Sequence, residues 1–176
     1  SKKGDESCMP YFNKAVQLAP LSGIPHLYLH DHYLSRKQNV KAFKELKMAF
    51  QSSDVSIDSK TKILLEYYER TFKDSSLLPQ ADTLMQIIQV VNATDARTFT
   101  VVGDFYFRDK KYQAAYDAFR KALELDKSKY VIWHQVMVLQ SQLDLFQEMK
   151  ISATEAIELF PNEPAPYLFL AVVLLQ

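Results

Sequence analysis

The sequence predicts an all-α protein of about nine to ten antiparallel helices. Glycine is rare, with 3 in 176 residues, and no segment alternates apolar and polar residues as a half-buried strand does. Apolar residues instead recur at three- and four-residue intervals, the spacing that places them on one face of a helix. With 48% hydrophobic and 24% charged residues, the chain has ample apolar surface to bury in a folded unit.

The pattern is clearest at residues 96–129, where two expected helices flank the polar turn 108–111. The apolar positions that repeat at helical spacing are Phe99, Val102, Phe105, Tyr106, Tyr112, Ala115, Phe119, Ala122 and Leu123. Gly103 stands inside the first of these helices, where glycine costs about 1 kcal/mol relative to alanine. We therefore expect a packing reason for this glycine, namely a close approach of its backbone to Ala115 on the second helix.

This unit resembles the tetratricopeptide repeat (TPR), a helix–turn–helix of about 34 residues with the pattern W-x2-L-G-x2-Y…A-x3-F…P. The matching positions are Gly103, Tyr106, Ala115 and Phe119, with Phe99 and Val102 at the Trp and Leu positions. Lys127 stands where the final Pro is expected, which departs from the pattern. The resemblance implies an α-α superhelix, or TPR solenoid, in which each repeat buries its apolar face against its neighbours.

The same spacing recurs along the chain and predicts a single array. An interval of 34 positions separates Ala15 from Ala49, Ile88 from Ala122, and Ala122 from Ala156. The interval from Ala49 to Ile88 is longer, and we expect the extra residues in the loop 73–79, because lengthening a loop costs little entropy. The array then consists of a half repeat at 1–22, full repeats at 23–56, 57–95, 96–129 and 130–163, and a half repeat at 164–176.

Each repeat predicts a pair of helices. The expected helices outside residues 96–129 cover residues 5–19, 23–36, 39–51, 57–72, 78–91, 130–143, 146–160 and 164–176. Ser56 or Asp58 is expected to cap the helix that begins at Ile57, by accepting a hydrogen bond from an unpaired backbone N–H group. Cys8 falls where the repeat has a small residue, so we expect it to be a small buried hydrophobe.

The charge balance argues against a nucleic-acid partner. Lys and Arg together number 21, as do Asp and Glu, whereas a nucleic-acid-binding domain normally carries a basic surplus. The apolar run 168–175 is far shorter than the roughly 20 residues that a membrane-spanning helix needs. The chain shows no secretory signal, and its ends suggest a piece of a longer protein. We expect that longer protein to be bacterial. Bacterial cytoplasm and cell envelope both remain open as its location.

No motif predicts a catalytic, cofactor or metal site, so we expect a protein that is not an enzyme and needs no cofactor. His26 and His30 are four residues apart, but the zinc-protease motif needs a Glu directly after the first His, and Leu27 stands there. The segment 54–58 has the start of a calcium loop without its later Gly and Glu. G-x-S-x-G, a glycine-rich phosphate loop and Cys-x-x-Cys are absent from the sequence.

The TPR resemblance implies binding of a protein or peptide segment in a groove lined by the first helix of each repeat. The groove residues that the repeat pattern indicates are Leu27, Asp31, Leu65, Tyr68, Arg97, Asp104, Phe107, Arg108 and His134. We expect Tyr68 and Phe107 to be anchors, because aromatic residues and Arg dominate binding hot spots. The family's basic and Asn clamp for a chaperone's C-terminal carboxylate is missing, since Leu27 and Leu65 are among the residues at its positions.

Two alternatives to a binding scaffold remain. The chain could be the docking or accessory region of a larger enzyme or envelope assembly protein. It could also self-assemble through 164–176, because the apolar face of an expected last helix without a mate is exposed.

Overall fold

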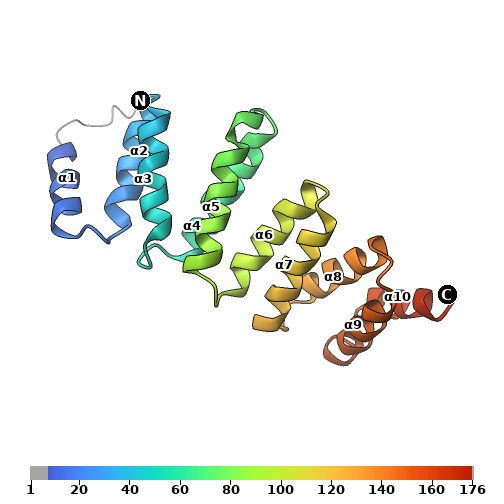
Figure 1. Cartoon of the computed structure of the whole chain (residues 1–176). Helices are drawn as coiled ribbons and strands as arrows, with labels where there is room; N and C mark the ends of the chain where they lie inside the picture. The colour runs from blue at the N-terminus through green and yellow to red at the C-terminus, as the bar shows by residue number, and fades with distance from the viewer. Residues whose placement is uncertain (1–7, 176) are drawn as a thin grey trace. The chain divides into compact units, whose positions relative to one another are not determined.

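A computed structural model describes residues 8–175. In this part of the chain the structure has ten α-helices and no strand, which confirms the all-α prediction (Figure 1). The chain forms two compact units: unit 1 extends to residue 93, and unit 2 begins at residue 94. Within the described residues, each unit has two antiparallel helix pairs and one further α-helix, and each unit is described by itself.

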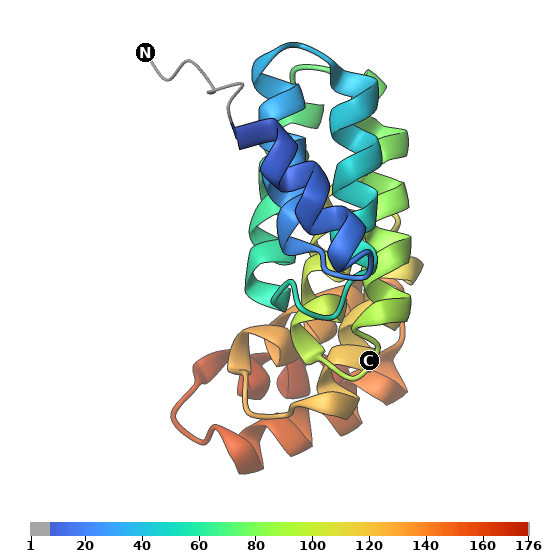
Figure 2. The same ribbon diagram turned by 90° about the vertical axis from the view of Figure 1, so that its left-hand side faces the viewer.

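Within the residues that the structure describes, unit 1 has five α-helices and the 3-10 helix η2. Their bounds are α1 Met9–Leu18, α2 Ile24–Ser35, α3 Asn39–Gln51, α4 Ile57–Thr71, η2 Ser75–Leu77 and α5 Leu78–Val91. Helix α2 pairs with α3, α4 pairs with α5, and α3 packs on α5. Helix α1 packs on α2, and Phe12 of α1 stacks on Tyr28 of α2 at a ring separation of 5.2 Å. In Figure 2, α1 lies in front of the other helices of unit 1.

Unit 2 contains the other five helices. Their bounds are α6 Ala96–Arg108, α7 Tyr112–Leu125, α8 Tyr130–Gln142, α9 Phe146–Leu159 and α10 Pro164–Leu174. Each helix packs on the next, so α8 has α7 on one side and α9 on the other. The core between them is formed by small and large apolar residues, among them Ala115, Phe119, Ala122, Trp133, Met137 and Ala153.

The hairpin turns share one backbone feature. Lys37, Lys110 and Asp144 have φ values of 59°, 57° and 55°, and they lie in the turns α2–α3, α6–α7 and α8–α9. In each turn the next residue donates its N–H to a carbonyl in the last turn of the first helix, as in helix ends closed by a left-handed residue. The α4–α5 connection differs, since η2 fills the longer loop there and the Asp74 carboxylate accepts the Ser76 N–H at 3.0 Å.

The helix starts follow the expected capping chemistry in two cases. The Ser56 hydroxyl accepts the Ser59 N–H at 3.2 Å, so Ser56 rather than Asp58 caps α4. The Asp95 carboxylate accepts the Arg97 N–H at 3.0 Å and caps α6. Cys8 precedes α1 and is half-buried, so the expectation that it would be fully buried is wrong. Residues 5–7 of the expected first helix lie outside the described residues.

Gly103 has the packing reason that the sequence suggested, but a different partner. A Cβ atom at this position would lie 2.8 Å from two atoms of the Phe119 ring, which is closer than real side chains approach each other. The nearest neighbour is therefore Phe119, one turn beyond Ala115, and the expected contact with Ala115 is not the closest one. A large ring fills the space because glycine leaves it open.

Asp54 ties together two loops of unit 1. Its carboxylate accepts hydrogen bonds from the Ser22 hydroxyl at 2.6 Å, the Gly23 N–H at 2.8 Å and the Ser52 hydroxyl at 2.6 Å. These bonds, those from Ser22 and Ser52 first, lower the pKa of Asp54 from 3.8 to about 2. The carboxylate thus joins the start of α2 to the segment between α3 and α4.

We expect Asp54 to contribute an acid-sensitive part of the stability of unit 1. Because its pKa is lower in the folded chain than the ordinary value of 3.8, the contribution is fully present above pH 4 and is lost as the pH falls towards 2. Asp54→Asn should lower the free energy of unfolding by about 1 kcal/mol at pH 7, since the site is exposed, and this difference should shrink at pH 2. Urea unfolding followed by circular dichroism at several pH values measures it; a pH-independent difference would contradict the assignment.

Candidate functional site

A groove runs between α2 and α4 of unit 1, the first helices of two successive hairpins. It encloses about 300 Å³ and is lined by Leu27, His30, Asp31, Leu34, Ser59, Lys62, Ile63, Glu66, Tyr67 and Arg70. We call it the α2–α4 groove. Leu27, Leu34 and Ile63 are half-buried, whereas His30 and Tyr67 are buried. The apolar side chains therefore form the base of the groove.

Two polar contacts hold the base of the α2–α4 groove in place. His30 Nδ1 lies 2.9 Å from the Ala42 carbonyl oxygen; a carbonyl only accepts, so this nitrogen carries the proton and donates. The Tyr67 hydroxyl lies 3.3 Å from Gln80 Oε1, and burial raises the pKa of this tyrosine. These bonds to α3 and α5 orient the two rings that the groove residues surround.

The rim of the α2–α4 groove carries two acids and two bases, all exposed. They are Asp31 on α2 and Lys62, Glu66 and Arg70 on α4. Among the described residues, no ion pair joins these four side chains, although the Arg70 guanidinium lies over the Tyr67 ring at 5.1 Å from its centroid. An apolar base with unpaired charges of both signs suits a peptide, because a partner can bring the opposite charges.

The predicted groove residues of unit 1 fall in two groups. Leu27 and Asp31 line the α2–α4 groove. Leu65 is 47% exposed and Tyr68 packs edge-on against Phe72 at 5.5 Å, and neither lines it. Because Leu64 and Tyr67 of α4 are buried, a neighbouring stripe of this helix, with Lys62, Glu66 and Arg70, lines the α2–α4 groove. The alternation of Lys62, Glu66 and Arg70 at four-residue intervals was the available sequence signal for this stripe.

The predicted groove residues of unit 2 lie on α6 and α8. Arg97 donates to the Asp95 carboxylate at 3.0 and 2.7 Å, and Arg108 donates to Asp109 at 2.7 Å. Both cations are therefore engaged within the chain. Asp104 is exposed, yet the surrounding protein reduces the hydration of its carboxylate and raises its pKa to about 6.

The two aromatic candidates of unit 2 also have neighbours within the chain. Phe107 is half-buried and its ring lies 5.9 Å from that of Tyr112. His134 lies between Tyr130, at 6.3 Å, and Phe169, at 6.0 Å. Neither of them lines the α2–α4 groove.

The histidines of α2 serve the packing of the α2–α3 hairpin. His26 Nδ1 lies 2.6 Å from Glu45 Oε2, and His26 Nε2 is buried without a partner among the described residues. Within residues 8–175, no three His, Cys, Asp or Glu side chains are grouped so that they could hold a metal ion. None of the helices in the same range has the length and apolar character to cross a membrane.

Residues 96–129 match the family model of the tetratricopeptide repeat. Among solved structures, the chain is similar to the MamA protein, with 15% identity, a TM-score of 0.56, and 86% of this chain and 80% of that chain covered. YrrB, described as a TPR protein with an unusual peptide-binding site, has 13% identity and a TM-score of 0.54, with 92% and 81% covered. PilF of Pseudomonas aeruginosa has 19% identity and a TM-score of 0.53, with 86% and 67% covered.

These similarities establish the fold. The chain therefore contains a tetratricopeptide repeat at residues 96–129 and has the all-α fold of tetratricopeptide-repeat proteins.

Proposed function

We propose that the chain is a non-catalytic scaffold that binds an extended segment of a partner protein, and that the α2–α4 groove is part of its binding surface. The observation that carries this proposal is the half-buried apolar base of Leu27, Leu34 and Ile63 beneath a rim of unpaired charges. An apolar side chain of the partner would displace water from the base. Its charged neighbours would pair with the rim and set its direction.

The first helices of unit 2 supply further candidates for the same function. Arg97, Asp104, Phe107, Arg108 and His134 lie on α6 and α8, as the repeat pattern requires of groove residues. Phe107 remains the proposed anchor there, as does Tyr68 in unit 1. An accessory role within a larger enzyme or envelope assembly protein would use the same surfaces and differs only in what the partner is.

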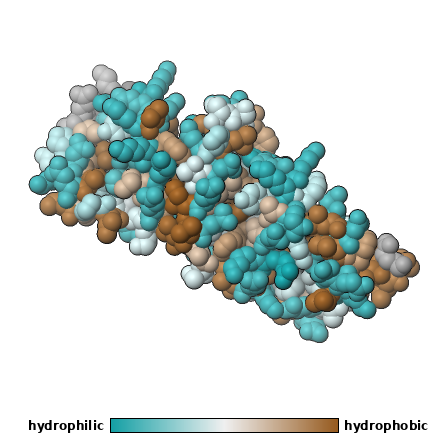
Figure 3. All heavy atoms as spheres, viewed as in Figure 1, coloured by the Kyte–Doolittle hydropathy of each residue, from teal (hydrophilic) through white to brown (hydrophobic). Residues whose placement is uncertain are grey.

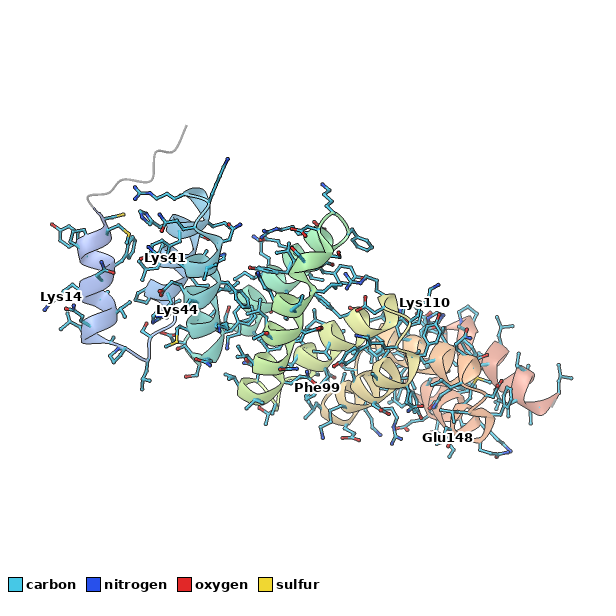
Figure 4. The ribbon with its side chains drawn as sticks, turned by 45° about the horizontal axis from the view of Figure 1, so that its top comes forward. Lys14, Lys41, Lys44, Phe99, Lys110 and Glu148 are labelled. Atoms are coloured by element: carbon cyan, nitrogen blue, oxygen red, sulfur yellow. The ribbon has the colours of Figure 1, made fainter. Side chains whose placement is uncertain are left out.

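The decisive experiment compares the effect on partner binding of charge reversals in the α2–α4 groove with that of charge reversals outside it. Proteins that the intact chain captures from cells are identified, and the affinity for the captured partner is then measured. Lys62→Glu combined with Arg70→Glu should weaken binding about tenfold or more, the effect typical of central interface residues. Lys41→Glu combined with Lys44→Glu, on the exposed face of α3 (Figure 4), is the matched control.

Circular dichroism should show unchanged helicity for both double variants, because all four positions are exposed. Phe107→Ala and Arg108→Ala test unit 2 in the same assay. Equal affinities for the groove and control variants would show that the α2–α4 groove is not part of the binding surface. Loss of binding only in the unit 2 variants would place the binding surface in unit 2.

Self-association through residues 164–176 is a second candidate, and one observation favours it. Apolar side chains gather at the end of unit 2 where α10 lies (Figure 3), and Leu168, Leu174 and Leu175 are 67%, 67% and 86% exposed. Light scattering over a range of protein concentrations measures the association, and a mass that stays that of a monomer would exclude it.

A further inference from the structure

A second hollow lies in unit 2, between α7 and α9, the second helices of two successive hairpins. It encloses about 250 Å³, and we call it the α7–α9 hollow. Its floor is a stripe on α8 formed by Trp133, Val136 and Gln140, which are all buried. Leu123 on α7 and Ile151 on α9 extend the apolar surface up the walls. Ile151 is 68% exposed, so this apolar wall is open to solvent.

One buried polar atom in the floor has no partner. Gln140 is 2% exposed, and its Nε2 lies 2.9 Å from the Ser152 hydroxyl and 3.3 Å from the Tyr116 hydroxyl. Its Oε1 is buried and has no hydrogen-bond partner within the described part of the chain. Both hydroxyls can donate or accept, so turning the amide over would only leave Nε2 unpaired instead. An unpaired buried amide atom is uncommon in folded proteins and is costly to leave without a partner.

The walls of the α7–α9 hollow carry charges of both signs. Arg120 on α7 lies over the Tyr116 ring at 5.7 Å from its centroid, and Glu148 is at the start of α9 (Figure 4). Neither has an ion-pair partner within residues 8–175. Near Trp133, by contrast, Lys127 and Glu155 pair with each other across the hollow. Among the residues that the structure describes, one end of the hollow is closed by this ion pair, and the remainder carries the charges of Arg120, Glu124 and Glu148.

We propose that the α7–α9 hollow is a second binding site, which takes an extended peptide segment of a partner protein with one aliphatic side chain between a basic and an acidic residue. The aliphatic side chain lies on Val136 and against Ile151. The acidic residue pairs with Arg120 and the basic residue with Glu148. This site is independent of the α2–α4 groove.

The chain carries its own reporter for this site, because Trp133 is its one tryptophan. The probes are two synthetic peptides, acetyl-Gly-Lys-Gly-Leu-Gly-Asp-Gly-amide and the same peptide with Lys and Asp exchanged. Each is titrated against the whole chain while the indole N–H signal of Trp133 and the methyl signals of Ile151 are followed by NMR. One of the two charge orders should shift both signals in a saturable way, and replacing Leu by Ala in that peptide should weaken binding about tenfold.

Two variants and a matched control complete the test. Arg120→Ser and Ile151→Ser should each weaken binding of the preferred peptide several-fold, whereas Lys121→Ser, next to Arg120 but outside the hollow, should not. The proposal is overturned if neither peptide shifts the Trp133 signal at millimolar concentration, or if Arg120→Ser behaves like Lys121→Ser. A Trp133 shift that depends on protein concentration without peptide would also overturn it, because the occupant would then be a second copy of the chain. The outcome at the α2–α4 groove does not bear on any of these results.

Discussion

Gly23→Ala is expected to lower the free energy of unfolding of unit 1 by about 3 kcal/mol, at the upper end of the usual range for overpacked positions. A Cβ atom at Gly23 would lie 2.6 Å from Val55 Cγ2, 2.7 Å from Ser52 Cβ and 2.9 Å from the Ala49 carbonyl oxygen. The last of these is backbone, so no change of side-chain rotamer relieves the contact. The start of α2 would have to move away from the end of α3.

That movement would also disturb the hydrogen bonds at Asp54. The Gly23 N–H donates to Asp54 at 2.8 Å. The Ser52 hydroxyl lies 2.6 Å from both the Leu21 carbonyl oxygen and the Asp54 carboxylate, so these two acceptors share its one proton. A displaced Gly23 backbone would lengthen these bonds as well as open the α1–α2 connection. The effect of the substitution should therefore spread to both loops.

Hydrogen exchange followed by mass spectrometry measures the expected result locally. Amides of α2 and α3 should exchange faster in Gly23→Ala, and urea unfolding should begin at lower concentration. Leu21→Ala is the matched control, because Leu21 is 88% exposed and surface substitutions usually change stability by less than about 0.5 kcal/mol. Equal protection in the two variants would show that the backbone around Gly23 adapts without cost.

Lys60→Ala is the second substitution with a large expected effect, a loss of about 3 kcal/mol in the free energy of unfolding of unit 1. Lys60 is 0% exposed. Its ammonium group donates to the Ser52 carbonyl oxygen at 2.8 Å and to Asn92 Oδ1 at 3.0 Å. Lys60 lies on α4, and its side chain therefore links the end of α3 to the end of α5.

Burial of the charged Lys60 ammonium group costs free energy, because the group loses its hydration. Desolvation lowers the pKa of Lys60, and the nearby Asp54 carboxylate partly opposes this shift. Because the folded chain binds this proton less tightly than the unfolded chain, stability should rise as the pH is raised towards the ordinary value of 10.5. The two hydrogen bonds and the packed stem offset the desolvation cost at neutral pH.

Two substitutions of Lys60 separate the contribution of packing to stability from that of the hydrogen bonds. Lys60→Met keeps most of the stem and loses the two hydrogen bonds, so it should cost about 1–2 kcal/mol, whereas Lys60→Ala also leaves a cavity. Lys44→Ala, at an exposed position of α3, should have an effect below about 0.5 kcal/mol. Urea unfolding curves rank the three variants, and a Lys60→Met variant as stable as the natural chain would show that the hydrogen bonds do not repay desolvation.

The helices could be predicted from the sequence because their signals are local. The bounds of α3, Asn39–Gln51, and α5, Leu78–Val91, agree with the expected ranges. Apolar spacing indicates which residues share a helix face, and the TPR pattern adds which helices form pairs. The expected cap at Ser56 follows from the same kind of reasoning, since a cap bonds to the N–H group of a residue only three positions away.

The candidate sites could be predicted only in part. Leu27 and Asp31 were expected in a groove and line one, but the residues opposite them on α4 were missed by one position along the helix. A shift of one residue turns a side chain by 100° around the axis, so Leu65 and the groove-lining Glu66 point to different surroundings. The α7–α9 hollow had no sequence signal, because its floor residues follow the apolar spacing of an ordinary core.

The sequence by itself determined the class of the fold, the order and length of the helices, and the repeat at 96–129. The tertiary structure alone decided which atoms meet between helices: Phe119 beside Gly103, the Lys60 ammonium between Ser52 and Asn92, and the unpaired amide atom of Gln140. The physical reason is the range of the forces involved. Helix formation depends on neighbours three and four residues apart, whereas these contacts depend on how helices settle against each other to bury apolar surface at close packing.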